Sequence, residues 1–145
     1  MKPSPLHLKH YFFTRIHLDA CEDPTCVENE GMGALKTQIQ CQPHNEDPLR
    51  WMVTLGVKLE DESEGQCSPY TADFEAVGLF TVDEGFPEER RTALVQANAP
   101  AVLFGAIREM LTNLTSRGPY NPINLKTVTF VDDIQSGKNT DKEEE

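Results

Sequence analysis

The sequence predicts an α+β fold, in which a four-stranded antiparallel sheet is followed by C-terminal helices. Residues 49–60 alternate between apolar and polar side chains, which is the pattern of a strand with one buried face. Residues 98–118 instead repeat apolar side chains at spacings of three and four, the pattern of an amphipathic helix. Strand-like segments come first and helical ones last, an order that is typical of this class.

The first strand is expected over residues 6–18, where apolar side chains occupy most even positions and polar ones most odd positions. His10 and Thr14 interrupt the apolar face, whereas Tyr11 and Phe13 add aromatic area to the opposite one. The pattern therefore predicts a strand that is covered on both sides in places.

The next three strands are expected over residues 34–42, 49–60 and 70–82, joined by polar segments that contain turn-forming residues. Short links of this kind favour antiparallel pairing. Near Gly78 both faces of the fourth strand become apolar, which predicts either a bulge at Gly78 or burial on both sides.

Two helical segments are expected after the sheet. A short helix over residues 88–97 leads into Asn98, which is placed as the N-cap of a second helix with Pro100 in its first turn and Gly118 as its stop. The apolar stripe of this second helix consists of Leu103, Ile107, Met110 and Leu114. An extended segment follows, with apolar side chains at Ile123, Leu125, Val128 and Phe130.

Length and charge limit the possible functions. The 145 residues fit one domain over residues 1–131, followed by an acidic tail over 132–145 that is too polar to bury and is expected to be disordered. The net charge of −11 repels nucleic acid and anionic membranes, so neither is expected as a partner. Because no N-terminal apolar run and no stretch of about 20 apolar residues occurs, the sequence predicts a cytoplasmic protein without membrane insertion.

Residues that could carry chemistry are scattered. The four cysteines, Cys21, Cys26, Cys41 and Cys67, do not form a disulfide scaffold and are expected to remain thiols in a reducing compartment. Cys21 and Cys26 have the spacing of the first half of a zinc site, but no second pair follows, so no metal is expected. The acids cluster in loops, and no catalytic or phosphate-binding motif occurs. The sequence therefore predicts neither an enzyme nor a cofactor.

The apolar surface of the predicted sheet exceeds what the helices can cover. A helix is about 10 Å wide, so one amphipathic helix and a short partner cover about one face of four strands. Apolar side chains on both faces of the first and fourth strands then remain uncovered. Such surface usually marks a binding or subunit interface, and a more complete core is the alternative.

Residues 98–130 contain a dense series of motifs: Arg108-Glu109 in the helix, Ser116-Arg117-Gly118 at its end, then Tyr120, Pro122 and Ile123, and finally Val128-Thr129-Phe130. Upstream, Gly78-Leu79-Phe80 closes the fourth strand. In this order of features the chain resembles the SecB family of protein-export chaperones, whose fold is a four-stranded antiparallel sheet followed by helices.

The resemblance implies a chaperone that holds unfolded polypeptide clients in apolar grooves without ATP. It further implies a homo-oligomer, either a dimer or a tetramer, and an acidic sheet surface that meets the preprotein translocase motor. By motif match, the residues bordering the groove would be Phe80, Tyr120, Pro122, Ile123 and Leu125. The core or oligomer-interface residues would be Leu103, Phe104, Ile107, Met110 and Leu114.

Family members usually carry a further helix after the segment that matches residues 128–130, whereas Val131 here leads into the acidic tail. An adaptor with the same fold, which binds one specific partner and has lost general client binding, is therefore the alternative function. A small-molecule-binding domain or an enzyme that uses the open groove is a third hypothesis.

Overall fold

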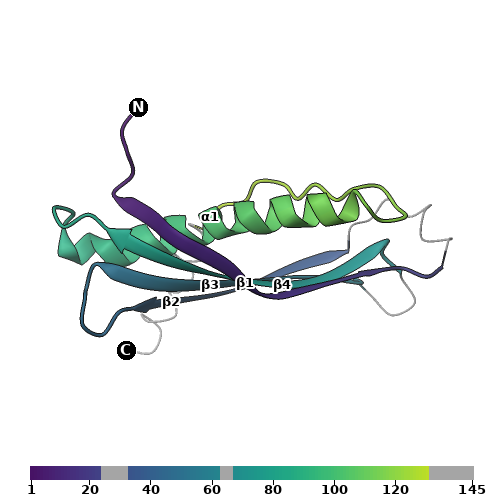
Figure 1. The fold of residues 1–145 in the computed structure, drawn as a ribbon, viewed down its shortest axis with the longest axis horizontal. Helices are drawn as coiled ribbons and strands as arrows, with labels where there is room; N and C mark the ends of the chain where they lie inside the picture. The colour runs from purple at the N-terminus through teal and green to yellow at the C-terminus, as the bar shows by residue number, and fades with distance from the viewer. Residues whose placement is uncertain (24–32, 63–66, 131–145) are drawn as a thin grey trace, which may run out of the picture.

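The computed structural model describes residues 1–23, 33–62 and 67–130. They form two layers, a four-stranded antiparallel sheet and one long helix that lies across one face of it (Figure 1). The strands are β1 (Leu6–Ala20), β2 (Ala34–Pro43), β3 (Arg50–Glu60) and β4 (Tyr70–Val82), and the helix is α1 (Glu88–Thr115). The predicted fold class is confirmed, and the strands lie close to their predicted bounds.

The strand order is β1-β4-β3-β2, and each neighbouring pair is antiparallel. β2, β3 and β4 pair in the order of the sequence through their short links, while β1 lies on the far side of β4. β1 and β2 are therefore the edge strands of the sheet. Along the described part of the chain, the outer edge of each has unpaired backbone groups.

Two register shifts place most of the apolar side chains of β1 on one face. The shifts lie between Leu8 and His10 and between Phe13 and Arg15. Since each bulge adds one residue, it resets the alternation of side chains. The β1 residues that pair with the helix-facing residues of β4 are Leu6, Leu8, Tyr11, Phe13, Ile16, Leu18 and Ala20. The prediction that Tyr11 and Phe13 lie on the opposite face was therefore wrong.

The core lies between α1 and the two central strands. Every odd-numbered residue of β3 from Trp51 to Leu59 is buried, as are the even-numbered residues of β4 that face the helix. The pairing of β3 with β4 is unbroken at Gly78, so the first predicted alternative, a bulge at that residue, does not occur. The second alternative, burial on both sides, holds at Val77, which lies on the face opposite the helix and is 7% exposed. A Cβ atom at Gly78 would lie 2.5 Å from the ring of Phe80 and 2.9 Å from Leu103, which is too close for any larger residue.

α1 is one continuous helix, so the prediction of two helical segments with a boundary at Asn98 was wrong. Asn98 does not cap a helix; its side-chain amide donates a hydrogen bond to the carbonyl of Leu94 at 2.9 Å. Pro100 lies inside the helix, at a usual cost of about 3 kcal/mol. That cost is opposed by a buried stripe that continues across Pro100 at a spacing of four residues: Val95, Ala99, Leu103, Ile107, Leu111 and Thr115.

Cys21 and Cys67 form a disulfide, so the prediction that these two residues remain thiols was wrong. Sequence spacing alone could not pair them, because β1 and β4 become neighbours only in the sheet. The described part of the chain has no group of three His, Cys, Asp or Glu side chains able to hold a metal ion, and it has no helix long and apolar enough to cross a membrane. Cys26 and the predicted tail over 132–145 lie outside the described residues.

Candidate functional site

The chain after α1, residues 119–130, runs back alongside the helix and is called here the return segment (Figure 1). Near its start, the backbone N–H of Ile123 donates to Thr115 Oγ1 at 2.9 Å. At its end, the rings of Phe130 and Phe104 meet edge to face with centroids 6.1 Å apart. The return segment is therefore antiparallel to the C-terminal half of α1 and covers part of it.

Hydrogen bonds and ring packing of two tyrosines hold the start of the return segment against the sheet. The backbone N–H of Tyr120 donates to Tyr70 Oη at 3.1 Å, and Tyr70 Oη donates to the carbonyl of Thr115 at 3.3 Å. The two rings pack edge to face with centroids 5.6 Å apart. Tyr120 Oη donates in turn to the carbonyl of Cys21. The end of α1, the start of β4 and the end of β1 thus meet at one cluster of contacts.

Four of the five predicted groove residues lie in the return segment. Ile123 and Leu125 are buried, Tyr120 is half-buried, and Pro122 is exposed. Phe80 lies apart from them, buried beneath α1 where its ring and Leu103 both approach Gly78. The predicted groove residues thus lie on the helix side of the sheet, but they do not form one continuous surface.

The predicted core or interface residues of the helix fall into two groups, one buried and one half-buried. Leu103, Phe104 and Ile107 are buried in the core, whereas Met110 and Leu114 are half-buried beside it. The core also includes Leu111 and Thr115, which the sequence analysis missed. The four-residue spacing from Ile107 was the signal for Leu111. Thr115 carried no such signal, because it is polar and its burial depends on bonds to Leu111 and Ile123.

An exposed apolar row lies along β1 on the helix side of the sheet. Its members, Leu8, Tyr11 and Ile16, are 37%, 43% and 50% exposed because α1 lies mainly over the central strands. We call these three residues the β1 row. Their alignment depends on the two bulges, which the sequence pattern did not show. An apolar row beside an unpaired strand edge can accept an extended peptide through side-chain and backbone contacts.

The outer face of the sheet, opposite the helix, carries an exposed apolar area of its own, and a cavity lies at one end of the sheet. Phe12, Met52 and Leu79 are each about two-fifths exposed on the outer face. A cavity of about 1100 Å³ lies near the turn between β2 and β3; its lining includes Met52, Leu79, Trp51 and Phe80. The indole N–H of Trp51 is buried and has no acceptor among the described residues. Of the predicted groove residues, Phe80 alone contributes to this cavity.

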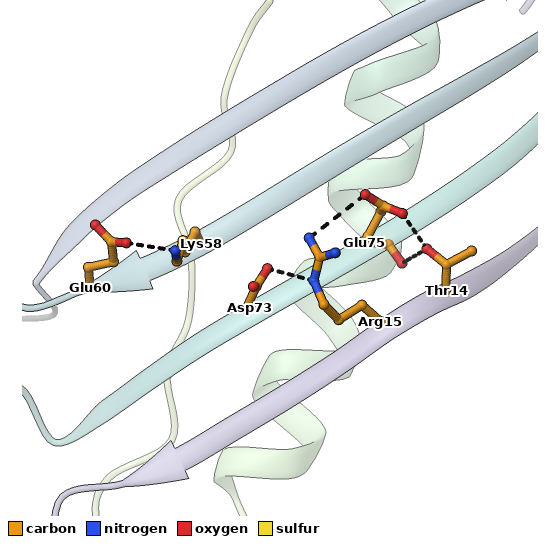
Figure 2. A network of polar contacts seen from close by, with 6 residues as sticks. All are labelled: Thr14, Arg15, Lys58, Glu60, Asp73 and Glu75. Carbon is orange, nitrogen blue, oxygen red and sulfur yellow. Dashed lines mark hydrogen bonds and ion pairs between the residues drawn. The ribbon is translucent and has the colours of Figure 1, made fainter.

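The outer face also carries a balanced set of charges (Figure 2). Arg15 on β1 contacts Asp73 at 3.0 Å and Glu75 at 3.7 Å, both on β4. At the far end of β3, Lys58 and Lys36 contact the carboxylate of Glu60 at 3.0 and 2.7 Å. The three acids are thus matched by the three cations Arg15, Lys36 and Lys58.

These contacts alter the pKa of the exposed groups. Hydrogen bonds from Lys36 and then from Lys58 lower the pKa of Glu60, and the hydrogen bond with Glu60 raises the pKa of Lys58. Both shifts favour the charged forms near neutral pH. Each of the three carboxylates Glu60, Asp73 and Glu75 therefore has a cation beside it, although the net charge of the chain is −11.

Comparison with known proteins agrees with this architecture. The chain is 33% identical over 78 residues to the protein-export protein SecB of Acidithiobacillus ferrooxidans, a match that covers 54% of this chain and 51% of that protein. It is 31% identical over 127 residues to SecB of Actinobacillus succinogenes, covering 86% of this chain and 75% of that protein. The match thus spans about half the length of the former relative and three quarters of the latter.

A solved structure shares the fold. It is a SecB-like chaperone of Mycobacterium tuberculosis in complex with a ChAD peptide from the HigA1 antitoxin. It superposes with a TM-score of 0.57 at 20% identity, over 86% of this chain and 88% of that one. The family model described as Preprotein translocase subunit SecB matches residues 2–137. With nearly the whole sequence matched and the sheet-and-helix arrangement in agreement, the chain belongs to the SecB family.

Proposed function

We propose that this protein is a cytoplasmic molecular chaperone, which holds non-native polypeptides against the helix side of its sheet without ATP. Its clients are either preproteins for export or one dedicated partner. Membership of the SecB family supports the general role. The observation that carries the proposed site is the β1 row, in which Leu8, Tyr11 and Ile16 remain exposed beside an unpaired strand edge.

The chemistry of the β1 row suits an unfolded client. An extended peptide can donate and accept backbone hydrogen bonds along the edge of β1 while its apolar side chains contact Leu8, Tyr11 and Ile16. Neither kind of contact demands a particular sequence. The return segment lies on the same side of the sheet and touches the end of β1 through Tyr120 and Cys21, so the predicted groove residues would border the same surface.

The other edge strand, β2, supports a homo-oligomer. A second copy could pair with the edge of β2, which would leave the β1 row and its edge accessible to clients in grooves between subunits. We therefore infer a dimer or tetramer, which static light scattering distinguishes by mass. A monomeric mass at micromolar concentration would contradict this part of the proposal.

Aggregation of a reduced client protein, followed by light scattering, tests the proposed function. The wild-type protein is expected to suppress aggregation at a few-fold molar excess, and Ile16→Ser is expected to weaken suppression. Leu79→Ser is the matched control, because Leu79 is similarly exposed but lies on the outer face. No suppression by the folded wild-type protein, or equal losses in both variants, would contradict the proposed site.

The alternative is an adaptor for one specific partner. The balanced charges of the outer face favour it over a general role in export, because they reduce the acidity with which the sheet would attract a translocase motor; the set consists of Arg15, Lys36 and Lys58 with Glu60, Asp73 and Glu75. Binding to that motor stays a prediction. An adaptor would capture one protein tightly and leave client aggregation unchanged.

A further inference from the structure

The Cys21–Cys67 disulfide joins two strand ends at the side of the molecule where the return segment begins. Cys21 follows the last residue of β1, and Cys67 precedes the first residues of β4, 46 positions later in the sequence. Both residues are half-buried, so neither lies in the closed core of the molecule. Disulfides are rare in the reducing compartment proposed for this protein, and those that form there are usually redox-sensing or catalytic.

The disulfide is connected to the return segment through Tyr120. The hydroxyl of Tyr120 donates to the carbonyl of Cys21 and, at 3.4 Å, to that of Asp23 two residues later; its backbone N–H donates to Tyr70 Oη at 3.1 Å. One tyrosine therefore links the disulfide-bonded end of β1 to the first residues of the return segment. Its ring also packs edge to face on Tyr70, so the side chain has a defined orientation.

Among the described residues, one further backbone hydrogen bond holds Cys21. β1 ends at Ala20, and beyond it the backbone N–H of Cys21 donates to the carbonyl of Pro69 at 2.8 Å. That hydrogen bond lies at the end of the strand pair, where local opening costs least. The covalent bond to Cys67 is the stronger restraint. Breaking it would leave the carbonyl of Cys21 free to move away from Tyr120.

We propose that Cys21 and Cys67 form a redox-responsive site that controls how firmly the return segment is held against the sheet. In the disulfide state Tyr120 is anchored and the segment is closed. Reduction by glutathione opens the site: a glutathione thiolate attacks one sulfur, the S–S bond breaks, and a mixed disulfide forms. A second glutathione resolves it, so two protein thiols and one glutathione disulfide result. Glutathione disulfide reverses the reaction.

The consequence for clients depends on the proposed function. Ile123 and Leu125 of the return segment are buried and belong to the hydrophobic core. When Tyr120 is released, the start of this segment can lift and uncover apolar surface next to the β1 row. The reduced protein is therefore the form that binds unfolded polypeptides more tightly.

Hydrogen exchange measured by NMR tests the redox site without any client. The protein carries Cys26→Ser and Cys41→Ser, so that Cys21 and Cys67 are its remaining cysteines. After reduction, the amide hydrogen of Tyr120 is expected to exchange about two- to tenfold faster. This factor corresponds to the net free energy of one hydrogen bond. An unchanged exchange rate would overturn the proposal.

Tyr120→Phe separates this coupling from a general loss of stability. The variant keeps the disulfide but lacks the hydroxyl that reaches Cys21. Its residue-120 amide is expected to exchange fast in both redox states. If the full redox difference persisted in Tyr120→Phe, the link through Tyr120 would be refuted.

Client binding is measured separately, by the affinity of a fluorescent unfolded polypeptide before and after reduction. Tighter binding after reduction is expected, and equal or weaker binding would refute the direction of control. A redox-dependent exchange rate without client binding in either state would support the redox site and contradict the chaperone function.

Discussion

The hydroxyl group of Tyr70 occupies the space that a side chain at residue 118 would need. A Cβ atom on Gly118 would collide with it, and Tyr70 cannot easily move because it is buried and bonded to Thr115 and Tyr120. The glycine that ends the Ser-Arg-Gly motif therefore allows the chain to turn closely past the start of β4. The glycine is needed because it has no side chain to collide with Tyr70, and a sequence motif cannot reveal that contact.

Gly118→Ala is expected to lower the free energy of unfolding by about 1–3 kcal/mol, the usual cost of overpacking. Urea unfolding followed by circular dichroism measures it. Gly105→Ala is the control: Gly105 lies in α1 with nothing within 4 Å of its added Cβ, so alanine should stabilise the helix by up to about 1 kcal/mol. Equal effects of the two substitutions would contradict the contact with Tyr70.

The buried stripe of α1 predicts that alanine substitutions at two adjacent residues lower the free energy of unfolding by different amounts. Leu111→Ala should lower the free energy of unfolding by about 2–5 kcal/mol, because Leu111 is 1% exposed and its removal leaves a cavity. Met110→Ala should cost clearly less, because Met110 is half-buried beside the core. The same urea experiment compares them. A larger cost for Met110 would mean that this residue is buried in an assembly.

The Cys21–Cys67 disulfide should contribute about 4 kcal/mol to stability, the chain-entropy value for a loop of this length. Adding a reductant should therefore shift the urea midpoint of the wild-type protein downwards. The double variant Cys21→Ser, Cys67→Ser should resemble the reduced protein and show no response to reductant. Cys41→Ser is the control and should respond as the wild type does, because Cys41 is outside the disulfide.

The Glu60 cluster predicts a dependence of stability on acid pH. Because the pKa of folded Glu60 is lowered by Lys36 and Lys58, its contribution is present above the unfolded value of 4.5 and is lost as the pH falls through the folded value. The effect should be small, since both lysine side chains are largely exposed and the Glu60 side chain is about one-third exposed. Comparing urea midpoints at pH 7 and pH 3 measures it.

Lys36→Met combined with Lys58→Met should reduce that difference between the two midpoints. Lys9→Met is the control, because Lys9 makes no ion pair among the described residues and should leave the difference unchanged. An unchanged difference in the double variant would show that other acids cause the acid dependence.

The candidate site was partly predictable. The return segment was found by its motifs, and Ile123 and Leu125 lie in a segment that follows α1 back toward its start. The β1 row could not be found, because the bulges at Lys9 and Thr14 change which side chains share a face. Bulges depend on how two strands fit together, and neither residue has a side chain that demands one.

By itself, the sequence determined the local elements of this protein. The alternation in residues 49–60 and the stripe from Leu103 to Ile107 are periodic, and burial of one face requires that periodicity in a single segment. Tertiary structure alone decided the neighbours: β1 beside β4, Cys21 bonded to Cys67, and α1 continuous through Pro100. The physical reason is that these features are stabilised by contacts between residues far apart in the chain. The local pattern of apolar and polar side chains carries no information about such contacts.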